Sequence, residues 1–527
     1  MRRKYVFVIF YFCLFTFYLA AQPTQEWVAR YERPSGSSGI ANQMALDKVG
    51  NCYVLGNTAA NGGVMVLIKY NSSGDTAWTR TYPQTGNVGV VADSIGNVYI
   101  TGYFGPSFGP YNIVTIKYNP VGVQQWLKIY DSGGNDECRD IAMDKTGNVY
   151  IGGFSDNQSL IIKYNINGDT VWTRKYGETN YRFPGINLIL DYQNNVFISG
   201  RREHTPSSTG SQFTIKYDSN AVFRWINNPL ENLMISPTKT GTDISGNVYV
   251  TGQSFNNNIL TIKYDFNGNE VWQRIYDGPG IGTDRPTDLK IDLAGNVVIT
   301  GISYGTGSGS DYLTMKYNSF GDSIWVKTYN GTNSNNDESY SLDIDDSNNV
   351  YITGRSINTG FSWDYATIKY LSNGTQAWLS LYNNQPTNGE DIAYKVLVDK
   401  NRNVFVTGTS RGFVGGPSDY LTIKYSQTVG IDPLITSITN QYQLEQNYPN
   451  PFNPVTRIKY QIIKNNETAK IVVFDIIGRE LATIINEKHL TGTYEIAFDA
   501  KNLSSGIYFY KLITGDFTET KKMILIK

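Results

Sequence analysis

The sequence predicts an all-β protein that consists of an eight-bladed β-propeller of four-stranded antiparallel blades and a smaller C-terminal β-domain. Three observations support this fold class. One pattern recurs eight times between residues 43 and 425, in copies that start 46 to 54 residues apart. Tyr, Phe and Trp, which favour strands, number 39, 23 and 9. Short apolar runs alternate with clusters of Asn, Ser, Gly and Asp, which is typical of strands joined by turns.

Residues 1–21 have the features of a secretory signal peptide. Basic residues at 2–4 precede an apolar core from Tyr5 to Leu19, and Ala20 and Ala21 follow it. We expect cleavage after Ala21. A membrane anchor is the alternative, but an apolar run of about 15 residues is shorter than the ~20 that a spanning helix needs. No other stretch is long and apolar enough, so we expect no transmembrane segment in the mature chain.

Charge and cysteine content exclude several classes of protein. The formal net charge is -1, and cleavage of the basic leader would leave a charge near -4. Nucleic-acid-binding proteins need a basic stripe that follows the phosphates, so we expect no nucleic-acid partner. Cys52 stands where other copies of the repeat have Val, and Cys138 falls in a predicted loop two repeats away. We therefore expect neither a disulfide nor a cysteine metal site.

The repeat has three landmarks, and their spacing is close to the ~40–50 residues of one four-stranded propeller blade. The first is Asp-x-x-Gly-Asn-Val-Tyr-(Val/Ile)-x-Gly, whose Asp recurs as Asp47, Asp93, Asp144, Asp191, Asp243, Asp292, Asp345 and Asp399. The second is (Ile/Met)-Lys-Tyr, with its lysine at Lys69, Lys117, Lys163, Lys216, Lys263, Lys316, Lys369 and Lys424. The third is a Trp eight residues after that Tyr, at Trp78, Trp126, Trp172, Trp225, Trp272, Trp325 and Trp378.

Each copy predicts four strands, which in the first copy are residues 43–47, 51–56, 64–70 and 77–82. Asp-x-x-Gly and Asn-x-x-Gly sequences join the first strand to the second and the third to the fourth. In such turns the Asp or Asn side chain accepts backbone N–H bonds, and Gly takes the positive φ. These hairpins make each unit antiparallel, which disfavours a parallel β-helix. A WD-type propeller also matches poorly, because the one Trp-Asp pair, at residues 363–364, falls in a predicted loop.

The two ends of the repeat array complement each other. The eighth copy stops at Tyr425 without a Trp strand, whereas the mature N-terminus opens with the Trp strand Trp27 to Tyr31. Pairing of this segment with the last copy would remove the unpaired edges of an open array. The sequence therefore predicts eight blades closed by the N-terminal strand.

These units resemble the bacterial SBBP repeats, named for a seven-bladed β-propeller, whose copies carry D-x-x-G-N-V-Y-V-T-G, an I-K-Y strand and a G-x-x-x-W segment. The resemblance covers residues 27–425. It implies a propeller fold and no particular activity. The family name implies seven blades, whereas this chain has eight copies.

Beyond the repeats we predict a linker at residues 426–442 and an immunoglobulin-like β-sandwich at 443–527, so that the propeller spans 22–425. The last domain resembles the type A C-terminal sorting domain of the type IX (Por) secretion system. The matching residues are Tyr448 to Pro454, Asp475 to Gly478, Leu503 to Tyr508 and Lys521 to Met523. The resemblance implies that the type IX machinery exports the chain from the periplasm of a Gram-negative bacterium, and that the propeller is secreted or held at the cell surface. An accessory domain without a sorting role is the alternative.

Candidate site residues must break the repeat, and few do. His204 and His489 are the two histidines, and His489 belongs to the C-terminal domain. A Ser-His-Asp or Cys-His centre would therefore need His204. Arg201, Arg202, Glu203 and His204 form the most charged segment after a Gly landmark, and we predict them as ligand-binding residues. A solvated loop is the alternative.

We predict no catalytic residue, no metal site and no cofactor. The repeated Asp lacks the Asp-x-Asp-x-Asp-Gly spacing of calcium loops, so we interpret it as a turn cap. The repeated lysine is expected to cover a neighbouring blade with its stem, with its amine in water or paired with a repeated Asp. Acids also recur between copies, at Asp136-Glu137, Asp284, Asp337-Glu338 and Glu390-Asp391. Their equivalent positions favour a repeated structural contact.

The leading functional hypothesis is an exported binding module that holds an unknown protein or glycan through one loop-bearing face. The alternative is a secreted carbohydrate-active enzyme, a glycoside hydrolase or lyase, that uses the acids or residues 201–204 at the propeller mouth.

Overall fold

The computed structural model describes residues 22–526 except 33–36, 59–62, 84, 107–108, 206, 208–209, 229–233, 308, 333–334, 358–361, 385–388, 414, 428–441, 465–466, 490–491 and 516. The predicted signal peptide and residues 428–441 of the predicted linker lie outside the described residues. The chain divides into two compact units, one ending at Gln427 and one starting at Thr428. The described residues contain strands and no helix, and hence no helix that could cross a membrane.

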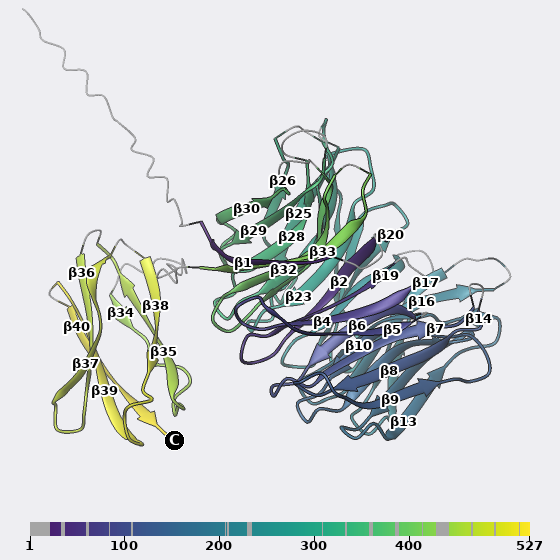
Figure 1. Ribbon diagram of the computed structural model, residues 1–527. Helices are drawn as coiled ribbons and strands as arrows, with labels where there is room; N and C mark the ends of the chain where they lie inside the picture. The colour runs from purple at the N-terminus through teal and green to yellow at the C-terminus, as the bar shows by residue number, and fades with distance from the viewer. Residues whose placement is uncertain are drawn as a thin grey trace, which may run out of the picture. The chain divides into compact units, whose positions relative to one another are not determined.

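The described strands of the N-terminal unit form eight sheets, numbered here by repeat (Figure 1). Sheet 1 contains β2 (Gly39–Leu46), β3 (Cys52–Thr58), β4 (Val64–Tyr70) and β5 (Thr76–Pro83). Sheet 2 contains β6 (Thr85–Ala92), β7 (Val98–Phe104), β8 (Asn112–Tyr118) and β9 (Gln124–Tyr130). Sheet 3 contains β10 (Asp136–Met143), β11 (Val149–Ser155), β12 (Gln158–Tyr164) and β13 (Thr170–Tyr176). Sheet 4 has five strands, β14 (Tyr181–Arg182), β15 (Gly185–Leu190), β16 (Val196–His204), β17 (Gly210–Tyr217) and β18 (Phe223–Asn227).

The other four sheets have four strands each. Sheet 5 contains β19 (Met234–Thr242), β20 (Val248–Ser254), β21 (Ile259–Tyr264) and β22 (Glu270–Tyr276). Sheet 6 contains β23 (Arg285–Ile291), β24 (Val297–Gly305), β25 (Gly309–Tyr317) and β26 (Ser323–Tyr329). Sheet 7 contains β27 (Glu338–Ile344), β28 (Val350–Ser356), β29 (Asp364–Tyr370) and β30 (Gln376–Tyr382). Sheet 8 contains β31 (Asp391–Val398), β32 (Val404–Arg411), β33 (Ser418–Ser426) and β1 (Thr24–Tyr31).

The predicted hairpin turns are present. Oδ1 of Asp47 accepts hydrogen bonds from the backbone N–H of Val49 and Asn51, at 3.0 and 2.9 Å. Gly50 takes a φ of 86°, which an L-residue rarely adopts. The short turns between the first and second strands and between the third and fourth strands close the same end of a sheet, and we call that end the hairpin face. The opposite end, with the longer loops and the connections between sheets, is the loop face.

One recurrent contact at the hairpin face joins neighbouring sheets. Nζ of Lys69 and Nε1 of Trp78 both donate to the carbonyl oxygen of Pro120 in the next sheet, at 2.8 and 3.1 Å. A Cβ atom added to Gly122 would lie 2.8 Å from the Trp78 ring, so the indole packs directly on this glycine. We call this arrangement the Lys–Trp contact. It recurs for Lys117 and Trp126 on Ile166, Lys216 and Trp225 on Phe266, Lys263 and Trp272 on Ser319, and Lys424 and Trp27 on Ser72.

The predicted position of the repeated lysine amine in water is wrong for the buried copies. Lys69 is 8 % exposed and Lys216 is 2 % exposed. Burial lowers the pKa of Lys216 to about 8. The alternative prediction, pairing with a repeated Asp, holds in one copy, where Lys316 contacts Asp292 at 2.9 Å. The amine is thus a fixed hydrogen-bond donor between sheets.

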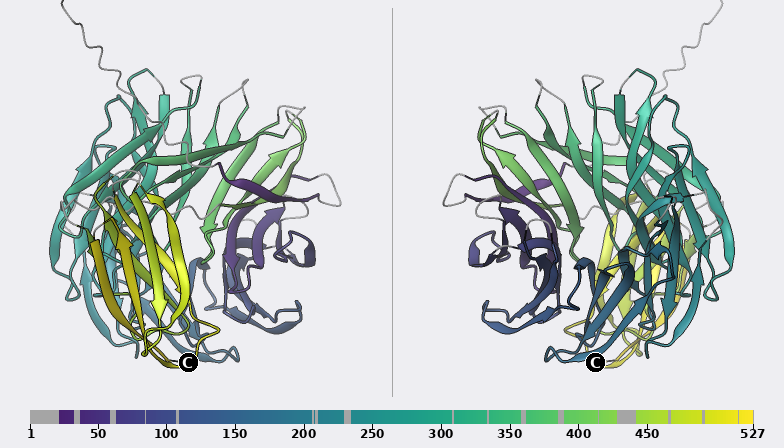
Figure 2. Two further views of the ribbon diagram at one scale, coloured as in Figure 1. Left: turned by 90° about the vertical axis from the view of Figure 1, so that its left-hand side faces the viewer. Right: turned by 90° about the vertical axis from the view of Figure 1, so that its right-hand side faces the viewer.

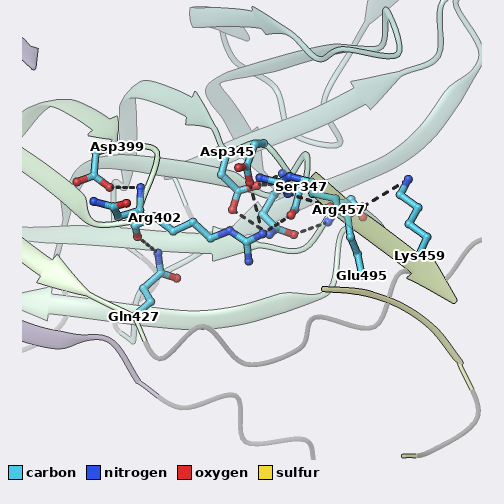
Figure 3. A network of polar contacts seen from close by, with 12 residues as sticks. Asp345, Ser347, Asp399, Arg402, Gln427, Arg457, Lys459 and Glu495 are labelled. Carbon is cyan, nitrogen blue, oxygen red and sulfur yellow. Dashed lines mark hydrogen bonds and ion pairs between the residues drawn. The ribbon is translucent and has the colours of Figure 1, made fainter. Parts of the chain in front are cut away.

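Sheet 7 makes the Lys–Trp contact with a side chain instead of a hairpin. Sheet 8 has no hairpin after β33, because the chain leaves the sheet there. Lys369 and Trp378 instead donate to Oε1 of Gln427, both at 3.0 Å. The Gln427 amide in turn donates to the carbonyl oxygen of Arg402 at 2.6 Å (Figure 3). A glutamine two residues beyond the predicted propeller end therefore replaces the missing hairpin carbonyl.

The N-terminal strand pairs with the last repeat, as predicted for Trp27 to Tyr31. In the antiparallel ladder between β1 and β33, Trp27 lies opposite Lys424 and Tyr31 opposite Tyr420. The first strands of successive sheets pack in sequence order, and β31 of sheet 8 packs against β2 of sheet 1. Figure 2 shows this, with green sheet 8 beside purple sheet 1. Ala29, Phe405, Cys52 and other residues of sheets 8 and 1 share one apolar core.

Both described cysteines are buried and free. Burial of Cys52 agrees with its interpretation as a small apolar residue of the repeat. Cys138 lies in strand β10, however, and not in a loop. Its register position opposite Gly153 explains the difference, since the strand starts two residues before it. Burial raises the pKa of the Cys138 thiol to about 12, which leaves it unreactive at neutral pH.

The C-terminal unit contains two described sheets. One consists of β34 (Gln443–Leu444), β35 (Val455–Ile462) and β38 (Gly492–Asp499), and the other of β37 (Glu480–His489), β36 (Glu467–Phe474), β39 (Gly506–Thr514) and β40 (Phe517–Leu525). Both sheets contribute to one apolar core. His489 is 5 % exposed, and its Nε2 lies 2.8 Å from the Tyr460 hydroxyl, so this histidine is part of the core.

Candidate binding face

The recurrent aspartates at the loop face have a structural role. Each is at most 2 % exposed and accepts a backbone N–H from the connection before its sheet. The pairs are Asp136 with Ser132 (2.6 Å), Asp284 with Gly278 (2.5 Å), Asp337 with Gly331 (2.8 Å) and Asp391 with Asn384 (2.7 Å). The interpretation of these acids as a repeated structural contact fits this geometry.

The glutamates beside them face arginines. Glu137 pairs with Arg139 at 2.7 Å, Glu338 with Arg355 at 2.9 Å, and Glu390 with Arg411 at 2.8 Å. All of these side chains are partly exposed, so the loop face carries matched charges at several sheets.

Aromatic rings gather around one of these pairs, at sheets 7 and 8. The guanidinium of Arg355 lies 4.0 Å from the Trp363 ring centre and 5.8 Å from that of Tyr340. The Tyr340 ring stacks on Tyr394 with centres 5.6 Å apart, and its hydroxyl donates to Glu338 at 2.6 Å. We call Glu338, Tyr340, Arg355, Trp363 and Tyr394 the aromatic–arginine cluster.

Backbone bulges position the two tyrosines. The register of the first two strands shifts between Ser339 and Ser341 in sheet 7, and between Ala393 and Lys395 in sheet 8. Tyr340 and Tyr394 are the extra residues, and a bulge re-aims its extra side chain away from the ladder. Burial and the bond to Glu338 raise the pKa of Tyr340. Its phenol is therefore a hydrogen-bond donor at any physiological pH.

A pocket of about 300 Å³ opens beside the cluster, between sheets 8 and 1. Its lining includes Tyr394, Glu390, Arg411, Asn57 and Thr409. One aromatic ring with carboxylate, guanidinium, amide and hydroxyl groups is the mixture typical of small-molecule sites. Tyr394 connects the pocket to the aromatic–arginine cluster.

The predicted ligand-binding residues lie on a strand rather than in a loop. Arg201, Arg202, Glu203 and His204 end β16, because β16 extends to pair with the additional strand β14. Arg202 pairs with Glu178 at 2.8 Å, and its guanidinium lies 3.5 Å from the Tyr181 ring centre. Arg201 pairs with Glu203 at 3.1 Å.

Among the described residues, His204 contacts no carboxylate that could orient it for triad chemistry. Its ring lies 5.0 Å from that of Tyr181, and its Nδ1 lies 2.8 Å from the Ser207 hydroxyl, in an exposed position. In a triad, a carboxylate bonds the ring nitrogen of the histidine that does not face the nucleophile. The side chains of the described residues that contact His204 are those of Tyr181 and Ser207. Ligand binding by residues 201–204 stays a prediction.

Charged side chains also meet along the first strands of sheets 5 to 8. Lys395 contacts Asp288 at 3.6 Å, and Lys290 contacts Asp343 at 3.5 Å. Burial would raise the pKa of Asp288, but Lys395, Lys239 and Lys290 outweigh it and lower that pKa. Asp288 also accepts the backbone N–H of Leu342 in the next sheet at 3.1 Å. The Lys290–Asp343 pair joins sheets 6 and 7, and the Lys395–Asp288 pair joins sheets 6 and 8. The sequence patterns did not identify either pair.

In the C-terminal unit, two of the motif segments lie against each other. The backbone N–H of Phe452 donates to the carbonyl oxygen of Ile524 at 2.9 Å, and Oδ1 of Asn450 accepts the N–H of Ile524 at the same distance. Met523 is fully buried. The Tyr448 to Pro454 segment is therefore fixed to the terminal strand.

One curated relative aligns with about two thirds of this chain. The uncharacterized WD repeat-containing protein L264 of Acanthamoeba polyphaga mimivirus is 23 % identical over 450 residues, which cover 68 % of this chain and 32 % of that protein. The match thus spans about a third of the length of the relative. Together with the antiparallel four-stranded sheets, this likeness indicates a β-propeller.

Two of the solved structures that resemble this chain are a lectin and a β-propeller domain. The BP39L lectin from Burkholderia pseudomallei is 8 % identical with a TM-score of 0.46, over 66 % of this chain and 99 % of the lectin. The β-propeller domain of the Trilobed protease from Pyrococcus furiosus is 9 % identical with a TM-score of 0.41, over 66 % of this chain and all of that domain.

Residues 446–527 match the family model described as a secretion system C-terminal sorting domain. This match covers nearly all of the domain that the sequence analysis places at 443–527. The chain therefore ends in a sorting domain that supports its export by type IX secretion to the cell surface or the medium.

Proposed function

We propose that this chain is an exported eight-bladed β-propeller, closed by β1, that binds a glycan through the aromatic–arginine cluster on its loop face. The eight sheets, the β1–β33 ladder and the packing of β31 on β2 support the blade count and closure. The repeat landmarks favour the SBBP class. The proposal also includes the route of export. The sorting domain would direct the chain out of the periplasm of a Gram-negative bacterium, and the propeller would then be released or stay attached to the cell surface.

The residue types in the aromatic–arginine cluster are the reason why we propose a glycan as the ligand. Tyr340, Trp363 and Tyr394 offer ring faces for the apolar C–H faces of sugars. Arg355 and Glu338 offer donors and acceptors fixed by their mutual bond, which suits hydroxyl groups. Each arginine in the cluster and pocket is matched by a glutamate, so the surface has little net charge to attract a polyanion.

The experiment that tests glycan binding compares variants on the two faces. Glycan-array binding by the full chain is expected, with affinity falling at least tenfold in Trp363→Ala. The matched control Phe320→Ala removes an aromatic ring that is 78 % exposed on the hairpin face, and it should leave binding unchanged. Equal losses in both variants, or capture of proteins but no glycan, would contradict the proposal.

A reporter experiment tests the sorting role separately. In a host with type IX secretion, a reporter fused to residues 443–527 should reach the surface or medium. The same reporter without these residues should stay in the periplasm. Export of both fusions would contradict the sorting role without affecting the glycan proposal.

The carbohydrate-active enzyme remains the alternative hypothesis. It would need two carboxylates that reach a bound sugar at a set separation. Asp136, Asp284, Asp337 and Asp391 are buried and hold backbone N–H groups. Release of reducing sugar from the glycan that the array identifies would favour the enzyme.

A further inference from the structure

Three acceptor oxygens lie buried without a hydrogen-bond donor near the loop face of sheets 7 and 8. They are Oδ1 of Asp364, of Asp391 and of Asn383. Asp364 is 2 % exposed and Asp391 is fully buried. Buried polar atoms in native proteins nearly always have a partner, such as a protein group, an ordered water or an ion. Three unsatisfied oxygens in one place therefore require an explanation.

The strand register brings these residues together. The N–H of Asp391 donates to the carbonyl oxygen of Trp363 at 2.7 Å, so Asp391 is adjacent to Asp364 across the boundary between the sheets. In sheet 7, Tyr365 lies opposite Tyr382. Asp364 precedes Tyr365, and Asn383 follows Tyr382 directly after the end of β30, so the same register places Asp364 and Asn383 side by side.

The equivalent positions in other sheets are satisfied differently. In sheet 8, Asp419 occupies the position of Asp364 and pairs with Arg30 at 3.2 Å. In sheet 2 the position is Asn112, which donates to Asp131 at 3.1 Å. Asp364 instead faces a second carboxylate.

The electrostatics of the pair are unfavourable without a cation. Burial and the Asp391 charge raise the pKa of Asp364 to about 7. Burial raises the pKa of Asp391 to about 6, although Ser410, Asn384 and Arg30 act against it. Arg30, on β1, is the positive group that acts on Asp391, but its guanidinium already bonds Ser410 and Asp419.

We propose that Asp364, Asp391 and Asn383 bind one Ca²⁺ ion through these three oxygens. Carboxylate and amide oxygens are ligands that Ca²⁺ prefers, and water completes its six to eight positions. The two carboxylates neutralise the ion. Within the described residues no group of three His, Cys, Asp or Glu side chains is placed to hold a metal. With two carboxylates, the site belongs to the weak class of extracellular calcium sites, with Kd on the order of 10⁻⁴–10⁻³ M.

Metal binding can be measured without any glycan, so this proposal stands apart from the proposed function. Tb³⁺ is added to the full chain with excitation of tryptophan, because Trp363 is the chain neighbour of Asp364 and can sensitise the ion. Terbium emission that CaCl2 displaces is expected for the wild type and for Asp419→Asn, the matched control. Asp364→Asn should lose that emission, and emission equal to that of the wild type would overturn the proposal.

Thermal unfolding distinguishes an ion from a shared proton. Ionised carboxylates bind Ca²⁺, so 10 mM CaCl2 should raise the Tm by a few °C at pH 8 and by less at pH 5. The raised folded-state pKa values mean that, in EDTA, the stability from this pair is present near pH 4 and is lost as pH rises through 6 to 7. Asp364→Asn removes one charge, so it should fold, should lose the dependence on CaCl2 and should keep only the weaker pH dependence of the buried Asp391. A wild-type Tm that depends on pH but not on CaCl2 would assign a proton to the pair and overturn the proposal.

Discussion

The hairpin face and the loop face of the propeller use the same strands for different purposes. At the hairpin face, a lysine, a tryptophan, a backbone carbonyl and a glycine make the same contact repeatedly, and five pairs of neighbouring sheets have it complete. At the loop face, buried aspartates recur at four sheets and glutamate–arginine pairs at three, whereas the aromatic–arginine cluster occurs at sheets 7 and 8. The difference teaches that the repeat preserves stability at one end of its strands and leaves the other end free to vary.

The largest stability effect is expected when a hairpin glycine gains a side chain. In Gly122→Ala, the new Cβ would meet the Trp78 ring at 2.8 Å, at a residue whose φ is 80°. We expect a loss of about 3 kcal/mol, because strain and the broken Lys–Trp contact add. Urea unfolding measures it. The control Gly412→Ala places its Cβ in open space at the loop face, and an equal loss there would break the distinction between the faces.

A loss of about 2 kcal/mol is expected for Gln427→Ala. This change leaves the Trp378 Nε1 and Lys369 Nζ donors without their acceptor. The exposed Gln125→Ala serves as control in the same thermal unfolding assay. An unchanged Tm in Gln427→Ala would show that the side chain does not replace a hairpin.

Sheet 3 offers a test in the opposite direction. In the facing hairpin of sheet 4, Ala221 occupies the glycine position with a φ of 63°, and Nε1 of Trp172, in sheet 3, is buried without a partner. Ala221→Gly should remove the backbone strain at this positive φ and let the Trp172 indole pack on residue 221. We expect it to raise the free energy of unfolding by about 1 kcal/mol. Ala294→Gly, in an exposed hairpin without a positive φ, should lower stability slightly. Loss of stability in Ala221→Gly would refute this explanation of the Trp172 position.

The smallest effect is expected at the loop face. Arg411→Ala removes an ion pair with Glu390 whose side chains are 34 % and 38 % exposed. Such pairs contribute little, so the midpoint of urea unfolding should stay within about 0.5 kcal/mol of the wild type. A loss as large as that of Gln427→Ala would mean that the loop face also holds the fold together.

Sequence patterns predicted the elements whose contacts are local. The Asp47 turn and the strands around it follow from residues within four positions of each other. The pairing of Trp27 with the last sheet was also predictable, because a repeat with a missing strand needs its complement. These predictions rest on a pattern that is visible eight times.

The remaining features depend on contacts that no repeat pattern displays. Gln427 follows the last landmark, so nothing in its neighbourhood marks it as an acceptor. Tyr340 and Tyr394 become surface residues through bulges, and a bulge is visible only in the register. Residues 201–204 lie on a strand because β14 pairs with its end. The sequence of β14, residues 181–182, gives no sign that it forms a strand. The lysine amine reaches a carbonyl in the next sheet, about 50 positions away in the chain.

The strand β1 has a consequence for the order of assembly. Arg30 and Asp419 bond across sheet 8 although 389 positions separate them in the chain. Bringing such distant segments together carries a large loop-closure entropy, and it must wait until the last repeat has been synthesised. Until then β1 and β33 each expose an unpaired edge, and the apolar residues that sheets 8 and 1 share stay uncovered. A nascent or translocating chain is therefore most prone to aggregate just before its two ends meet, and a chaperone that covers those edges would act at that moment.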